Sequence, residues 1–324
     1  MAIDVTFTSG VIASREKFFL KEKLLRMCET GAEEAFRALV ESGYGAGETA
    51  ANVYEYEKLV EAEEKALDEF IREYAPSDSE LAYFLAPRDF HNAKALLKAA
   101  YLATPAEKML APEGEIGLKT LEEAVKSGDF SFLSGKNDEL KEACEKVKEA
   151  FQEDGVSGSF VGEVFEKATY AHLFKRCKRK GGLKKFLLAK VDMQNILTAF
   201  RSENEREAEG KFLPFGTLKT EALLSLFGDE ETVEKAFSGS SYSDFVKKCL
   251  AARKRGKPPV EAERALASFE TDFFREKRYE LEKTEPFLYY VFRRRAENAN
   301  VRIVFVCLLA GLKEQEIKKR LRAI

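Results

Sequence analysis

Three stretches of the sequence carry an acidic residue followed three positions later by asparagine, and each then continues as an apolar helical run. The residues are Asp89 and Asn92, Asp192 and Asn195, and Glu297 and Asn300. Positions i and i+3 share one face of a helix, so each carboxylate and amide can reach the same neighbouring helix or loop. Such groups could bind a metal or act in catalysis. Because they recur in three separated segments, the pattern favours a structural hydrogen-bond lock.

Phosphate-binding loops are not indicated. The Gly-Lys pairs at 135–136, 210–211 and 256–257 lack both the earlier glycine and the following Ser or Thr of a P-loop. The Gly-Ala-Gly stretch at 45–47 follows a helical segment and not a strand, so a dinucleotide fingerprint there would lack its sheet edge. We therefore expect no cofactor and no direct nucleotide binding.

Residues that commonly serve as catalytic bases or metal ligands are sparse. His91 and His172 are the only histidines, and no GxSxG or HExxH pattern occurs. Five cysteines are an odd number without a close pair, which indicates reduced, buried thiols in a cytosol. We expect no catalytic residue and no metal site, and a hydrolase site built from Asp89, Asp192 and Glu297 is only a third hypothesis.

Basic side chains cluster at residues 175–180, 253–257 and 293–295. Lys plus Arg number 53 against 56 Asp plus Glu, and few aromatic residues interleave with the clusters, so nucleic-acid binding is not favoured. The clusters are either solvated helix surfaces or sites that dock an acidic protein. The candidate docking residues are Lys175, Arg176, Arg179, Arg253, Arg255, Arg293 and Arg294.

The elements that must position these residues are helices. Apolar residues recur at three- and four-residue steps, as at Leu20, Leu24 and Met27, while prolines and most glycines fall between such segments. We predict an all-α fold. The most apolar stretch, 303–312, is shorter than the ~20 residues that a membrane-spanning helix needs. The first residues lack the pattern of a signal peptide.

The chain also resembles itself at a nearly constant period. The three acids are 103 and 105 residues apart, and segments 39–44, 124–130 and 236–242 share a fainter similarity. We predict three helical units at 1–108, 109–212 and 213–324. Their natural packing is a funnel around a pseudo-threefold axis, with partners on its concave side.

The C-terminal stretch 288–303, continuing through 310–321, resembles the end of the C subunit of prokaryotic V-type (A/V-type) ATPases, which is similar to eukaryotic subunit d. Residues 14–25, 43–45 and 89–92 are similar to the same family. Two departures are Arg295, where a second acid is expected, and Cys307-Leu308 in place of Gly-Lys.

The resemblance implies a non-catalytic rotor subunit that caps the membrane-embedded ion-carrying ring and receives the central stalk in its socket. The partners would be central-stalk and ring subunits, and the location would be cytoplasmic, peripheral to the membrane. The transported ion and the pump or synthase direction depend on other subunits. The alternative function is a generic helical scaffold or adaptor.

Overall fold

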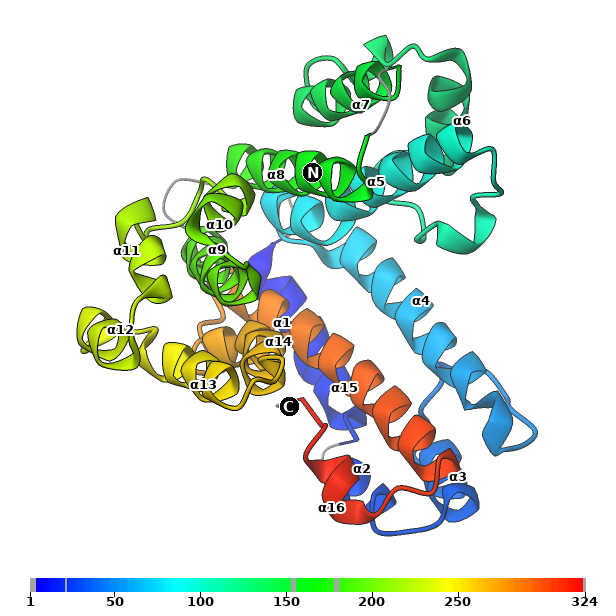
Figure 1. Ribbon diagram of the computed structural model, residues 1–324. Helices are drawn as coiled ribbons and strands as arrows, with labels where there is room; N and C mark the ends of the chain where they lie inside the picture. The colour runs from blue at the N-terminus through cyan, green and yellow to red at the C-terminus, as the bar shows by residue number, and fades with distance from the viewer. Residues whose placement is uncertain (1–3, 21, 153–155, 178–180, 323–324) are drawn as a thin grey trace. The chain divides into compact units, whose positions relative to one another are not determined.

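The computed structural model describes residues 4–20, 22–152, 156–177 and 181–322. Every regular element within these ranges is a helix, which confirms the predicted all-α fold (Figure 1). Nowhere in the same ranges does a helix combine the length and the apolarity that crossing a bilayer requires. The chain divides into two compact units, one made of Met1–Ser77 with Phe237–Ile324 and the other of Asp78–Ala236. The predicted division into three units stays a prediction.

The first compact unit, which we call the terminal unit, combines both ends of the chain. Its helices are α1 (Val5–Arg15), α2 (Glu22–Met27), α3 (Ala32–Glu41), α4 (Tyr56–Tyr74), α13 (Ser243–Lys254), α14 (Val260–Arg275), α15 (Glu285–Leu309) and α16 (Glu314–Lys318). Helix α15 packs against α1, α4 and α14 (Figure 1).

Helix α15 is the core of this unit because most of its side chains are buried, polar ones such as Glu297 and Asn300 included. Phe287 stacks on Phe70 of α4, and Phe292 stacks on Phe274 of α14, with ring centroids 5.7 Å apart in both pairs. Gly311, with φ of 73°, follows the end of the helix in the left-handed conformation that glycine adopts readily. Two flanking helices are thus held against one central helix by aromatic contacts.

The second compact unit, which we call the middle unit, holds the other helices. These are α5 (Asp78–Leu102), α6 (Leu118–Ser127), α7 (Asp138–Ala150), α8 (Gly158–Arg176), α9 (Gly182–Arg201), α10 (Glu205–Lys211) and α11 (Thr220–Leu224), while α12 (Glu230–Phe237) ends at the boundary of the two units. Helix α8 packs against α5 and α7. Their shared core includes Phe90, Phe130, Val147 and Phe165, all at most 3% exposed.

The fainter sequence similarity has a common backbone geometry. Each of its three segments contains a Ser-Gly pair, and the glycines are Gly43, Gly128 and Gly239. Their φ angles are 75°, 70° and 75°, and they follow the ends of α3, α6 and α12. Left-handed glycine terminates a helix at little steric cost, so the three pairs mark three equivalent helix ends.

Candidate functional site

The first acid and asparagine hold the loop that leads from α5 to α6. Asn92 donates a hydrogen bond from Nδ2 to the carbonyl of Ala111 (3.2 Å), and its Oδ1 accepts the N–H of the same residue (2.8 Å). Asp89 accepts the N–H groups of Glu115 at Oδ2 (2.9 Å) and of Ile116 at Oδ1 (3.2 Å). We call this arrangement a clamp: the amide holds both backbone groups of one residue, and the acid holds the loop that follows.

The second copy, on α9, makes the same contacts. Asn195 donates to the carbonyl of Leu213 (2.9 Å) and accepts its N–H (2.8 Å). Oδ1 of Asp192 accepts the N–H groups of Thr217 (2.8 Å) and Leu218 (2.9 Å), while Oδ2 accepts the Thr217 hydroxyl. Asp192 is fully buried, so these groups take the place of water around its carboxylate.

The third copy, on α15, holds the two ends of the chain. Asn300 donates to the carbonyl of Arg322 (3.1 Å) and accepts its N–H (2.8 Å). Oε1 of Glu297 accepts the N–H of Leu20 (2.6 Å), 277 residues away, and Oε2 accepts a hydrogen bond from Arg294 (2.5 Å). Burial raises the pKa of Glu297 against the opposing effect of the Arg294 charge.

The three clamps act at equivalent positions. Ile116, Leu218 and Leu20 each lie two residues before the start of a helix, namely α6, α11 and α2. A side chain that fixes the backbone at this point sets where the next helix begins. The clamps are therefore joints between a long helix and the short helix that follows it in space.

Two glycines outside the acid and asparagine motif complete the clamps. A Cβ on Gly114 would lie 2.3 Å from Oδ1 of Asp89, and one on Gly216 would lie 2.2 Å from Oδ1 of Asp192. The aspartate can thus approach the loop only because glycine leaves room. The third copy has the longer Glu297, whose extra methylene extends its reach, and the corresponding position is Phe18. A glycine two residues before Ile116 and Leu218 was the sequence signal.

Arg176, a predicted docking residue, is engaged inside the middle unit. Its guanidinium donates two hydrogen bonds each to Asp78 and Glu115, at 2.5 to 3.0 Å. Burial opposes the charge of Glu115, but the hydrogen bonds from Arg176 hold the pKa of that carboxyl below its usual range. With its side chain 7% exposed, Arg176 offers little surface to a partner.

The two histidines make contacts that need no catalytic role. His172 is fully buried, with Nδ1 3.1 Å from Glu139 and Nε2 3.2 Å from Arg176. Burial lowers the pKa of His172, because the charged imidazolium is poorly solvated there. Nε2 of His91 lies 2.8 Å from the carbonyl oxygen of Met109.

The other predicted docking residues differ in exposure. Lys175 is 47% exposed and pairs with Glu139 at 2.9 Å, and Arg253 and Arg255 are exposed at the end of α13. Arg294 is buried against Glu297, whereas Arg293 is partly exposed and lies over the ring of Phe19, 4.1 Å from its centroid. Arg179 lies outside the described residues.

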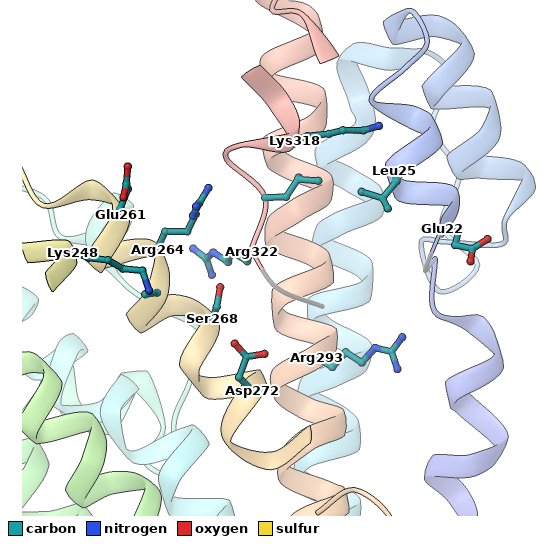
Figure 2. Close-up of a pocket in the computed structure, with 12 residues that line it drawn as sticks. Glu22, Leu25, Lys248, Glu261, Arg264, Ser268, Asp272, Arg293, Lys318 and Arg322 are labelled. Atoms are coloured by element: carbon teal, nitrogen blue, oxygen red, sulfur yellow. The ribbon is translucent and has the colours of Figure 1, made fainter. Parts of the chain in front are cut away.

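Arg293 lines a groove of about 750 Å³ within the terminal unit (Figure 2). The charged residues of the groove come from α2, α13, α14, α15, α16 and the segment after α16. They are the cationic Lys248, Arg264, Arg293, Lys318 and Arg322 and the acidic Glu22, Glu261 and Asp272. Cations therefore outnumber acids in the lining by five to three.

Several cations of the groove are incompletely matched. Lys318 pairs with Glu29 and Glu314, both at 2.7 Å. Among the described residues, no acid pairs with Lys248 or with the side chain of Arg322, and the buried Nε of Arg293 has no acceptor. The lining can therefore form hydrogen bonds and ion pairs with carboxylates brought by another molecule. Within the described ranges, no group of three or more His, Cys, Asp or Glu residues could hold a metal ion.

The comparisons with known proteins agree with the resemblance seen in the sequence. The model of the ATP synthase (C/AC39) subunit family matches residues 9–320. No curated protein matches the chain. Because the family match spans nearly the whole sequence, it confirms the expected family. The chain belongs to the ATP synthase (C/AC39) subunit family.

Proposed function

We propose that this chain is a non-catalytic rotor subunit of a V-type ATPase. It links the central stalk of the soluble ATPase head to the membrane ring that carries ions, and it transmits torque for ATP-driven ion transport or ATP synthesis. The observation that carries the proposal is the family match over residues 9–320. In this role the protein is cytoplasmic, peripheral to the membrane through the ring, and made of three units (1–108, 109–212 and 213–324) arranged as a funnel.

The clamps support a mechanical role. A subunit that passes torque must resist deformation. In each clamp the asparagine donates one hydrogen bond to a backbone carbonyl and accepts one from a backbone N–H, and the acid accepts one or more from backbone N–H groups. Hydrogen bonds to an ionised acceptor are stronger than neutral ones, and buried networks of this kind rigidify their surroundings. The long helices are thereby tied to the segments that follow them.

The groove is the proposed binding site for the stalk. Its unmatched cations, Lys248, Arg293 and Arg322, suit an acidic segment of a central-stalk subunit. Arg253 and Arg255 stand exposed at the end of the helix that also carries Lys248. Attraction between opposite charges increases the association rate and makes binding depend on salt.

The test is native mass spectrometry of the protein mixed with central-stalk subunits from the same organism. A one-to-one complex that survives desalting supports the proposal. If the protein binds neither the stalk subunits nor the detergent-solubilised ring, the proposal is overturned and the adaptor hypothesis is favoured.

Charge reversal locates the contact. Lys248→Glu combined with Arg293→Glu should weaken stalk binding at least about tenfold, because two attractive pairs become repulsive. Lys119→Glu combined with Lys126→Glu, two exposed changes on α6, is the matched control and should leave the affinity unchanged. Equal affinities for both variants would exclude the groove as the binding surface and leave the rotor role to the mass-spectrometric result.

A further inference from the structure

We propose that the third helical unit is divided between the two ends of the chain: α15 and α16 begin it, and α2, α3 and α4 complete it. The chain is then a circular permutation of three consecutive units, and its natural boundary lies between α4 and α5. This division would replace the boundaries at 1–108, 109–212 and 213–324, which follow the period of the sequence, and the proposed rotor role does not depend on it.

The clamps carry this inference. In the first two copies, one continuous loop supplies the residue held by asparagine and, a few residues later, the residues held by the acid. In the third copy, Asn300 holds Arg322 near the C-terminus, while Glu297 holds Leu20 near the N-terminus. Leu20 thus corresponds to Ile116 and Leu218, which follow the asparagine-bound residue on one continuous loop in the first two copies.

The order of elements after each clamp agrees. In the middle unit, the clamped loop leads to α6, then to Gly128 in its left-handed conformation, and then, after the additional helix α7, to α8, which packs on α5. In the terminal unit, Leu20 leads to α2 and α3, then to Gly43 with a similar φ, and then to α4, which packs on α15. Helices α2 and α3 therefore occupy the position next to α15 that α6 occupies next to α5, and α4 corresponds to α8.

The core of the terminal unit joins the same two segments. Leu24, Leu39 and Val60 from the N-terminal segment share one cluster with Val301 and Phe305 of α15, and each of these side chains is at most 1% exposed. Removing the N-terminal segment would expose this face of α15. The divided unit is thus held by an apolar core as well as by the clamp.

The groove lies along the seam between the two ends. Glu22 and Leu25 of α2 line it together with Lys318, Leu321 and Arg322. One wall of the groove consequently exists only while the N-terminal segment is docked. The inference on the divided unit does not depend on what binds there.

A circular permutant tests the inference. Its order is 76–324, a Gly/Ser linker of about fifteen residues with a root-mean-square span of roughly 20 Å, and then 4–75. The matched control carries the same linker but opens between Gly135 and Lys136, inside the middle unit. We expect the first permutant to keep native helicity by circular dichroism and to melt at or above the temperature of the control. A lower melting temperature than that of the control would overturn the inference.

Hydrogen exchange on the chain in its natural order gives a second test. Glu297→Ala should speed exchange of the Leu20 amide and of α2 at least about tenfold, because their anchor on α15 is lost. Arg322 should remain protected through Asn300. If exchange became faster at Arg322 but stayed unchanged at Leu20, the proposed division would be contradicted.

Discussion

Replacing Asp192 with alanine removes the acid of the second clamp. The carboxylate accepts two backbone N–H groups and one hydroxyl and is fully buried. The hydroxyl belongs to Thr217, which is exposed, so water can satisfy it after the change. Two hydrogen bonds to an ionised acceptor, at about 1.5 kcal/mol each, give a loss of about 3 kcal/mol in the free energy of unfolding.

This loss should appear as a lower melting temperature. For a domain of 150 to 250 residues, 1 kcal/mol corresponds to roughly 2–4 °C, so we expect a fall of about 6–12 °C for Asp192→Ala. The assay is thermal unfolding followed by circular dichroism at a helical wavelength. If the two compact units melt separately, only the transition of 78–236 should move.

Two further variants make the result specific. Asp192→Asn retains one oxygen that can accept both N–H groups, so it should cost clearly less than the alanine variant. Asp229→Ala is the matched control, because Asp229 also accepts the N–H and the hydroxyl of one threonine, Thr232, but is exposed. An unchanged melting curve for Asp192→Ala, or a fall no greater than that of the control, would refute the structural role of the clamp.

Three other predictions concern the middle unit. Gly216→Ala should lower the melting temperature about as much as Asp192→Ala, since its Cβ would displace the aspartate, whereas Gly162→Ala inside α8 meets no atom within 4 Å and should stabilise by about 0.5–1 kcal/mol. The lowered pKa of His172 stabilises the fold above about pH 6.5, and this contribution is lost as the pH falls, because the unfolded histidine binds a proton more readily. The melting temperature should therefore fall more steeply between pH 7.5 and 5.5 in the unmodified protein than in His172→Gln, and parallel curves would contradict this. Burial raises the pKa of Cys144 to about 12, so iodoacetamide at pH 8 should label this thiol only after denaturation, as peptide mass mapping would show.

The sequence alone was sufficient for the fold class and for finding the acid and asparagine pairs. Helical periodicity is a local property, and the repetition of Asp89, Asp192 and Glu297 at a steady interval pointed to equivalent positions. The family followed from resemblances spread along the chain and is confirmed by the match over residues 9–320. The local sequence pattern was therefore enough to identify the three equivalent acid and asparagine pairs.

Tertiary structure decided what those residues touch. The partners of Asn92 and Asn195 lie 19 and 18 residues further along, but the partner of Glu297 lies 277 residues away, and no periodicity relates such distant positions. Arg176 and Arg294 lie in basic runs like those of the exposed arginines, yet their side chains are only 7% and 6% exposed, because the fold brings acids to them. A charge pattern cannot show which carboxylate will neutralise it, because that depends on packing between distant segments, and the same packing gives the terminal unit a core drawn from both ends of the chain.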